Sequence, residues 1–590
     1  MINNIAIRNI LACAVIAAGS ANADELNQTI SVEKETQAVE HKADKLQSLP
    51  DPAHVTTRNV RLNFSDWAIP ASLDASLVTQ KPRPFDDGRK ADDKRGYVEY
   101  GMGNYLNIVG SAGYRLVDTE RTRLSLWLQH NSTNGTIADS KRFVTDDRIS
   151  LDFGQATKIG TFSANAAYRY NKFNYFAQSP DFSDDNRQKV DEAGVTLSLA
   201  RPVNGETTVG YHASIGYNFF GNSMAIASNI PAIEPLKPAD EHLLAIEGGI
   251  AVDLGSQSEI GLDLQFLQAA YKGVNDYRLD VSQLLPIPIG NERHSITSIK
   301  PYYSKNNGKM RLRLGARVDL STAGTLFRIA PEVAFDYHFS QRLAVSVTAT
   351  GGNRMNTYHT VAMRNRYINP LAIMPHSYTP IDAELRMNIG PMKGFSISPF
   401  IGFAQQNGAL IPTVYIQKKG QEIFPASIDT DAGTTSYGAM ELRGIKAGVD
   451  LKYNFNDIVE VKAGYMYTPQ DEDKGYIADD DRAEHSLKAS LRVTPISRLD
   501  LYANYSFRSG RNVHTFLLYN LDVPDTDIFP SVSNYSLGVV SDLGIGANFR
   551  INEYFHVYGQ INNLLNRSWQ DYYGMNCQKI HFLLGAGVKF

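Results

Sequence analysis

The densest group of potential metal ligands in this sequence is an acidic segment at residues 471–481. Six of its eleven residues are aspartate or glutamate. Calcium prefers hard oxygen ligands, which carboxylates supply, so this segment is a candidate calcium site. The candidate ligands are Asp471, Asp473, Asp479 and Asp481. The alternative interpretation is an acidic loop that is solvated and binds no ion.

Catalytic side chains form no familiar motif. The sequence contains no G-x-S-x-G, H-E-x-x-H, P-loop or C-x-x-C pattern, and its 13 histidines are dispersed. Histidines such as His338 and His581 fit the polar face of a strand. We therefore predict that the protein is not an enzyme and has no catalytic residues and no cofactor.

Most charged residues instead follow a two-residue period, as in Arg311, Arg313 and Arg317, which alternate with apolar residues. Successive strand side chains point to opposite faces, so each such segment has one apolar and one charged face. We expect the charged face to line a water-filled lumen. The lumen-facing candidates are Arg311, Arg313, Arg317, Arg328, Glu332, Asp336, Lys452, Glu460 and Lys462. Their mixed signs favour ion pairs and ordinary hydrated wall positions over selection of one type of ion.

The alternating segments are long for strands of a water-soluble protein. They span ~10–14 residues, the length that a tilted membrane strand needs, whereas soluble strands average ~5–6 residues. A soluble β-sandwich is the alternative, but its apolar faces would require a second sheet with a matching apolar face. We therefore predict an all-β protein, a transmembrane antiparallel β-barrel of outer-membrane type, over residues 95–590.

The connections between these segments alternate in length. Residues 118–121 and 255–258 form short ones, whereas 132–143 and 353–375 form long ones. Short periplasmic turns and long outer loops are the rule for such barrels. Counting back from the C-terminus predicts about 22 strands, with both chain ends periplasmic. A short connection at 323–325 leaves a count that differs by two open.

Residues 1–23 have the pattern of a secretory signal peptide, with Arg8 ahead of an apolar core and a small-x-small site at 21–23. Residues 24–94 form a short polar segment, periplasmic or lumenal, before the first strand. After residue 23 no uncharged apolar run approaches the ~18 residues of a transmembrane helix. A net charge of −4 gives no electrostatic reason to bind nucleic acid.

The last strand carries a candidate insertion signal on one face. Its residues are Phe582, Leu584, Ala586, Val588 and Phe590, which is the C-terminal residue. This pattern resembles the closing strand of bacterial outer-membrane β-barrels, which the barrel-assembly machinery reads. The resemblance implies a location in the outer membrane, with membrane lipids around the barrel and that machinery as a partner during insertion.

Four stretches resemble the TonB-dependent outer-membrane receptors. They are residues 96–105, 369–386, 483–491 and 559–574, the last containing the sequence Asn-Asn-Leu-Leu-Asn-Arg. The family's N-terminal plug domain is much longer than the segment that precedes the first strand here, so the resemblance covers the barrel and not the plug. Residues 29–33 loosely resemble the short box with which such receptors bind TonB.

The resemblance implies substrate uptake or transport across the outer membrane, with TonB or other outer-membrane proteins as partners. The alternative is a non-transporting, plugless barrel that is a structural or assembly component of an outer-membrane protein complex. A lumen of this size needs to be filled. The 24–94 segment, inward-folded loops or a partner protein are the candidates for filling it.

Overall fold

A computed structural model gives the structure of the chain. It describes residues 94–137, 140–174, 187–203, 207–223, 239–272, 293–368, 376–419, 422–425, 436–456, 458–469, 483–520, 531–572 and 574–590. Among these residues, no helix is both long and apolar enough to cross a membrane. The predicted signal peptide, nearly all of the 24–94 segment and the acidic segment at 471–481 lie outside the described residues.

Strands make up almost all of the described chain. The first half contains β1 (Gly96–Gly103), β2 (Ile108–Asp118), β3 (Thr122–Ile137), β4 (Ser140–Thr157), β5 (Gly160–Asn174), β6 (Arg187–Arg201), β7 (Val209–Asn222), β8 (Asp240–Gly255), β9 (Ser258–Lys272), β10 (Arg293–Asn306), β11 (Met310–Ser321), β12 (Phe327–Ser340) and β13 (Leu343–Arg354). The second half contains β14 (Ser377–Met392), β15 (Phe395–Lys419), β16 (Glu422–Pro425), β17 (Ser436–Phe455), β18 (Val459–Tyr467), β19 (His485–Ile496), β20 (Leu499–Ser509), β21 (Asn512–Asn520), β22 (Ser531–Ser536), β23 (Val540–Arg550), β24 (Phe555–Asn562), β25 (Gln570–Tyr572), β26 (Met575–Asn576) and β27 (His581–Lys589). Two short helices, η1 (Asn104–Leu106) and α2 (Tyr358–Ala362), lie between strands.

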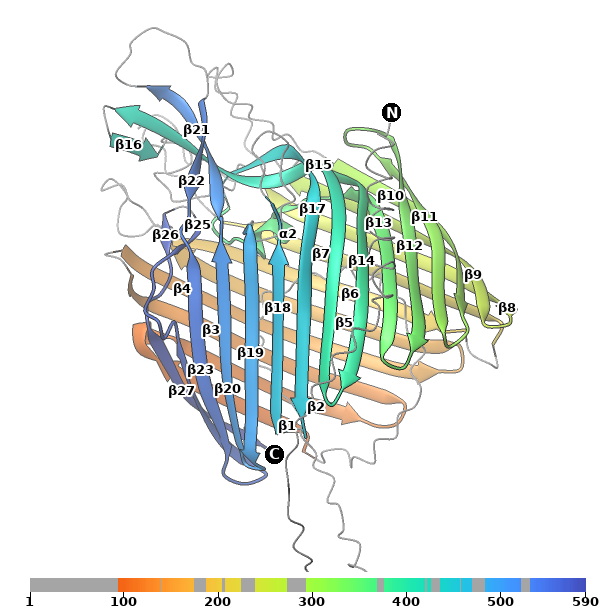
Figure 1. Cartoon of the computed structure of the whole chain (residues 1–590), viewed down its shortest axis with the longest axis horizontal. Helices are drawn as coiled ribbons and strands as arrows, with labels where there is room; N and C mark the ends of the chain where they lie inside the picture. The colour runs from red at the N-terminus through yellow and green to blue at the C-terminus, as the bar shows by residue number, and fades with distance from the viewer. Residues whose placement is uncertain are drawn as a thin grey trace, which may run out of the picture. The chain divides into compact units, whose positions relative to one another are not determined.

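Twenty-two of these strands form one closed antiparallel barrel, which confirms the predicted fold class (Figure 1). Each barrel strand pairs with the next barrel strand along the chain, so that β15 pairs with β17, β20 with β23 and β24 with β27, and β1 pairs with β27 to close the ring. The register at the closure runs from Tyr97 opposite Lys589 to Gly103 opposite Leu583. Closure removes the free strand edges that an open sheet would expose.

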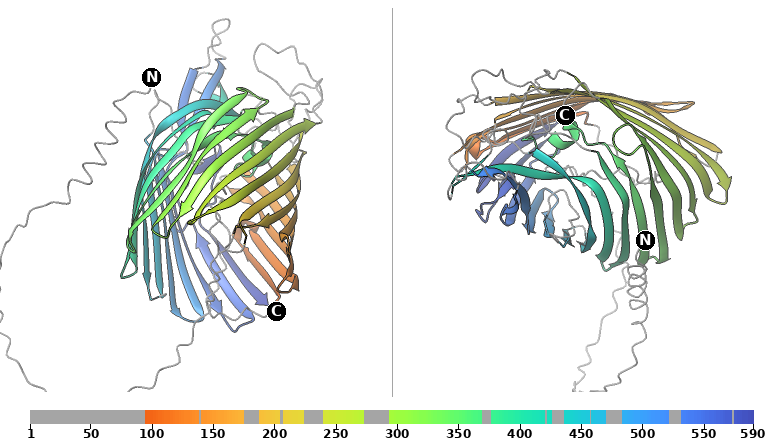
Figure 2. Two further views of the ribbon diagram at one scale, coloured as in Figure 1. Left: turned by 90° about the vertical axis from the view of Figure 1, so that its right-hand side faces the viewer. Right: turned by 90° about the horizontal axis from the view of Figure 1, so that it is seen from above.

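Shorter strands project from one end of the barrel. β21 pairs in parallel with the extension of β15 and antiparallel with β22, while β16 pairs back onto β15. β25 and β26 form a separate two-stranded sheet. Figures 1 and 2 show β21 and β22 rising above the rim, at the end of the barrel opposite the C-terminus.

The two faces of the wall differ as the alternation predicts. Large apolar side chains such as Leu128, Leu262 and Ile401 are about half exposed because their neighbours lie in the same sheet and nothing covers them. In water such a face would have to be buried, whereas lipid solvates it. On β27, Phe582 and Leu584 belong to this exposed set, as does Phe590 directly after the strand, and Ala586 and Val588 share the face of Phe582 and Leu584. The role of these five residues as an insertion signal stays a prediction.

One predicted long connection is wrong. Residues 132–143 were expected as a loop, yet β3 continues to Ile137 and β4 begins at Ser140. The polar composition of this segment suggested a loop. Beyond the apolar band, however, water solvates both faces of a strand, so polar residues continue the hairpin with an unbroken register from Ser132 opposite Thr145 to Ile137 opposite Ser140.

Candidate functional site

Residues 355–368, which follow β13, fold back against the inner wall of the barrel. We call this segment the lumenal cap. It contains α2, whose N-cap residue is Thr357. The Thr357 hydroxyl accepts a hydrogen bond from the Thr360 backbone N–H, and the Thr360 hydroxyl accepts one from the Thr357 backbone N–H. This reciprocal capping satisfies two backbone donors that a short helix leaves free. Figure 1 shows α2 within the ring of strands, toward the end where β21 and β22 project.

A single buried carboxylate holds the start of α2. Glu241, near the start of β8, has no solvent exposure. Its two carboxylate oxygens accept hydrogen bonds from the backbone N–H groups of Tyr358 at 2.6 Å and His359 at 3.1 Å. Hydrogen bonds to a charged group are worth about 1.5–3 kcal/mol each, and losing both would leave backbone donors buried without partners. Glu241 is therefore the main polar anchor of the cap.

Apolar contacts fasten the rest of the cap to the wall. Tyr358, Val361, Tyr367 and Ile368 are at most 5% exposed. They pack against inward-facing side chains of four neighbouring strands, namely Val144, Phe173, Val190 and Phe220. The ring of Tyr367 meets Phe173 edge to face at 5.6 Å. Burial also raises the pKa of the Tyr358 hydroxyl well above its usual range, so this side chain stays neutral.

An ion-pair network lies beside the apolar contacts. Arg169 of β5 is 2.5 Å from Asp146 of β4 and 3.3 Å from Glu192 of β6. The cap joins this network because His359 lies 3.4 Å from Glu192 and Arg366 lies 3.9 Å from Asp146. A histidine and an arginine of the cap therefore meet two acids of the wall, and the attraction between Arg366 and Asp146 is less screened in this half-buried setting than in water.

A second loop reaches the cap from the far end of the sequence. The Tyr572 hydroxyl donates a hydrogen bond to the Arg364 carbonyl at 2.6 Å, and Met575 is buried in the same apolar cluster. Both residues belong to the small sheet between β24 and β27. The cap therefore lies between the wall and this loop and contacts both.

Sequence reasoning located the cap's segment but not its anchor. The connection at 353–375 was predicted only as a long one, and its basic and aromatic residues fit a ligand or partner surface and an ordinary surface loop equally well. Its two tyrosines are buried instead. Glu241 was missed because it lies 117 residues before its partner and belongs to an ordinary acidic strand start.

The residues expected to face the lumen share the face opposite the exposed apolar residues on β11, β12, β17 and β18. Arg313 lies 3.1 Å from Asp263 and 3.2 Å from Glu332. The other recorded contacts join Arg311 to Asp336 at 3.9 Å, Arg317 to Asp319 at 2.8 Å, Arg328 to Asn353 at 3.0 Å and Lys462 to Glu460 at 2.6 Å, and Lys452 is opposite Lys462 in the register. Arg311, Arg313, Arg317 and Lys462 thus each have a carboxylate partner, whereas Arg328 contacts an amide and Lys452 is opposite a like charge.

The predicted calcium ligands Asp471, Asp473, Asp479 and Asp481 lie outside the described residues, so the calcium site stays a prediction. Within the described ranges, no group of three or more histidine, cysteine, aspartate or glutamate side chains is placed to hold a metal ion.

Comparison with protein-family models and with curated proteins gives no match for this sequence. Solved structures do match. The FrpB iron transporter from Neisseria meningitidis has a TM-score of 0.61 at 11% identity, with 85% of this chain and 82% of that chain covered. The siderophore receptor PirA from Acinetobacter baumannii has a TM-score of 0.60 at 10% identity, with 85% and 81% covered.

The ferric enterobactin receptor PfeA from Pseudomonas aeruginosa is similar as well, with a TM-score of 0.58 at 11% identity and coverage of 85% of this chain and 82% of that chain. At these identities the likeness concerns the fold. The chain has the 22-stranded barrel of outer-membrane receptors.

Proposed function

We propose that this protein is an outer-membrane uptake receptor whose lumen is closed by the lumenal cap and opens when the cap is released. The observation that carries the proposal is the anchoring of the cap by Glu241 inside the barrel. A wall of 22 strands encloses a wide lumen, and a loop held inside it is the kind of element that controls passage. The likeness to an iron transporter and to siderophore receptors supports uptake at the level of the fold.

The proposal also includes the energy source of uptake and the transported substrate. Residues 29–33 would couple the barrel to TonB, and the short 24–94 segment would take the place of a full plug. Ferric chelates are the first cargo to test, because the structural neighbours are named for iron and siderophore uptake. The long-loop end would face the outside and both termini the periplasm, as short periplasmic turns require.

A second function is a closed barrel that transports nothing and serves as a structural or assembly component of an outer-membrane complex. The number of contacts on the lumenal cap favours this structural function. The Glu241 carboxylate, the apolar cluster and the ion-pair network all hold the same segment. Such redundancy suits a permanent closure as well as a controlled one.

Conductance of the mature protein in planar bilayers separates the two functions. We expect low conductance for the wild type and an increase of roughly tenfold or more in open probability for Glu241→Ala, because the charge-assisted anchor is lost. Glu247→Ala is the matched control, since Glu247 lies on the same strand and face but contacts Gln265 at 2.8 Å.

Deletion of residues 24–94 tests whether that segment fills the lumen. The uptake proposal is wrong under two joint conditions. First, Glu241→Ala, the deletion and the two combined all stay closed while the barrel remains folded. Second, other outer-membrane proteins co-purify with the wild type. Uptake of a ferric chelate by cells that carry the wild type, and its loss without residues 29–33, would rule out the purely structural function.

A further inference from the structure

The outer face of β3 and β4 changes from apolar to polar between one pair of opposite residues and the next. The last apolar pair is Leu128 of β3 and Ile149 of β4, which are 45% and 40% exposed. The next outward positions are His130 and Asp147, which are opposite each other in the register. Ser132 follows His130 on the same face, because side chains two residues apart on a strand point the same way.

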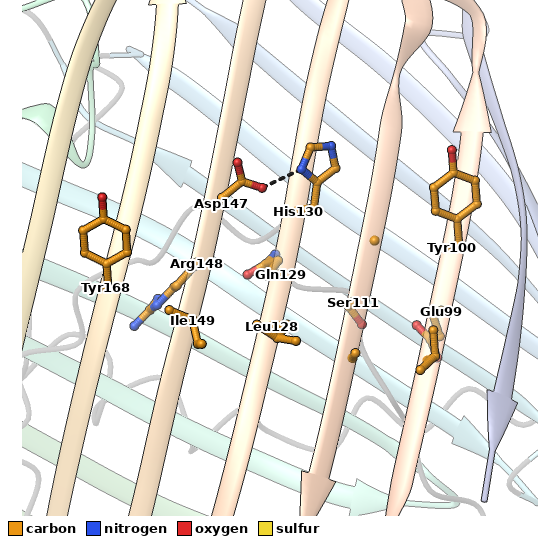
Figure 3. Close-up of a pocket in the computed structure, with 13 residues that line it drawn as sticks. Glu99, Tyr100, Ser111, Leu128, Gln129, His130, Asp147, Arg148, Ile149 and Tyr168 are labelled. Carbon is orange, nitrogen blue, oxygen red and sulfur yellow. Dashed lines mark hydrogen bonds and ion pairs between the residues drawn. The ribbon is translucent and has the colours of Figure 1, made fainter.

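These three polar side chains are connected in a row. His130 Nδ1 lies 2.6 Å from Asp147 Oδ1, and His130 Nε2 lies 3.0 Å from the Ser132 hydroxyl oxygen. Figure 3 shows the His130 ring turned toward Asp147. The aspartate fixes the tautomer with the proton on Nδ1, which leaves Nε2 free to accept the serine proton. A carboxylate, an imidazole and a hydroxyl in this order make the serine oxygen a nucleophile.

The row is accessible from outside the barrel. The side chains of His130 and Asp147 are 39% and 45% exposed. Beside them a groove of about 530 Å³ runs along the outer wall, lined by Val98, Tyr100, Leu128, Ile149 and Tyr168. Gly110 lies opposite His130 in the register and leaves the groove open, because it has no side chain. The groove is therefore apolar along its length and polar at the His130 end.

The position of the row along the wall indicates its substrate. It lies where the apolar outer face gives way to polar residues, and Tyr100 and Tyr168 flank it at the level where outer-membrane barrels carry an aromatic girdle. An acyl chain in the groove would lie within the hydrocarbon layer of the membrane, and the ester at the end of the chain would lie next to Ser132. The polar end is also the long-loop end, which the proposed membrane orientation places at the outer leaflet.

Contrary to the expectation from sequence motifs that the protein has no catalytic residues, we propose that Ser132, His130 and Asp147 form an acyl-ester hydrolase site on the outer wall that acts on membrane lipids. Ser132 Oγ attacks the ester carbonyl carbon while His130 Nε2 takes the hydroxyl proton. The C–O bond to the lipid alcohol breaks, and that alcohol leaves with the proton from His130. Water then attacks the acyl-serine with His130 as base, which releases the fatty acid and restores the serine. Asp147 stabilises the imidazolium in both halves of the reaction.

The rate of this reaction is limited by one feature of a regular strand. The backbone N–H groups around Ser132 belong to the paired ladders of β2, β3 and β4, so they are not presented together to a developing oxyanion. An oxyanion donor contributes about 10²–10³ in kcat, so we expect slow hydrolysis. An irreversible covalent label builds up on the serine with time even when turnover is slow, so covalent labelling is the most sensitive measurement.

The test uses the full mature chain in detergent with a fluorophosphonate probe that carries a long alkyl chain. We expect one label, mapped to Ser132 by mass spectrometry, and its loss in Ser132→Ala and His130→Asn. Ser125→Ala is the matched control because Ser125 lies on the same strand and the opposite face. A folded wild type that takes no label, or a label that persists in Ser132→Ala, would overturn the proposal.

A second measurement tests the groove. A Cβ on Gly110 would come no closer than 3.7 Å to any side chain, which is ordinary van der Waals contact, so Gly110→Leu introduces its side chain on the groove side without a clash at Cβ. We expect it to raise KM for long-chain esters severalfold and to leave short-chain esters unaffected. Equal effects on both chain lengths would refute the groove as the acyl site. Micelles of glycerophospholipid and of lipopolysaccharide, compared as substrates, distinguish the two sources of ester.

The conductance of Ser132→Ala separates this proposal from the uptake function. Ser132 is on the outer wall and does not contact the lumenal cap, so the variant should lose labelling and keep the wild-type conductance. The two proposals thus fail in different experiments.

Discussion

Arg313 shows how a single charged side chain is kept in the barrel wall. Two acids from neighbouring strands, Asp263 and Glu332, lie within 3.2 Å of its guanidinium, and the Tyr302 ring lies 3.5 Å from the guanidinium carbon. The three charged side chains are mostly buried, so the two carboxylates offset the cost of taking the guanidinium out of water, and removing either acid would leave the arginine with less compensation.

The one described cysteine gives a prediction at the residue scale. Cys577 is 6% exposed and packs with Val540 and Trp569, and burial raises the pKa of its thiol to about 11. Only the thiolate reacts with maleimides, so both access and ionisation oppose labelling near pH 8. We expect native protein to react at least tenfold more slowly than protein unfolded in detergent and urea, followed by mass spectrometry. Equal rates would show that the loop between β26 and β27 does not shield this thiol.

At the scale of elements, the closure between β1 and β27 depends on a close backbone approach. A Cβ on Gly103 would lie 1.7 Å from the Phe582 carbonyl oxygen, which is backbone and has no freedom to rotate away. We predict that Gly103→Ala lowers the free energy of unfolding by about 1–3 kcal/mol, the usual cost of overpacking. Urea titration of tryptophan fluorescence in detergent measures the change.

Gly154→Ala is the matched control for this closure, because a Cβ at Gly154 of β4 meets no atom within 4 Å. It should leave the free energy of unfolding unchanged within a few tenths of a kcal/mol. If both variants lose the same stability, the effect comes from glycine as a residue type and not from the β1–β27 contact.

For the whole molecule, closure of the ring predicts heat-modifiable behaviour. Every barrel strand is hydrogen-bonded on both sides, so no edge offers a place for detergent or denaturant to begin separating strands. We expect unheated protein in SDS to migrate faster than the boiled sample on a gel. Gly103→Ala should lower the temperature at which the two forms interconvert. Identical migration before and after boiling would contradict a barrel that is closed through β1 and β27.

The sequence alone determined the wall of this protein. The two-residue period, the strand lengths and the alternation of connections predicted an antiparallel barrel of about 22 strands, because a strand's faces and its span of the membrane are local properties. The same reasoning failed at residues 132–143, where polar composition does not distinguish a loop from a hairpin that water solvates on both faces.

Only the tertiary structure decided which residues work together. Glu241 and α2 are far apart in the chain and meet because the ring of strands closes and the cap folds inward. Asp147 reaches His130 because the register of β3 and β4 places them opposite each other, and a shift of one residue would turn one of them to the other face. The sequence carries the period of each strand, whereas register and closure, which are set by contacts between strands, assemble the sites.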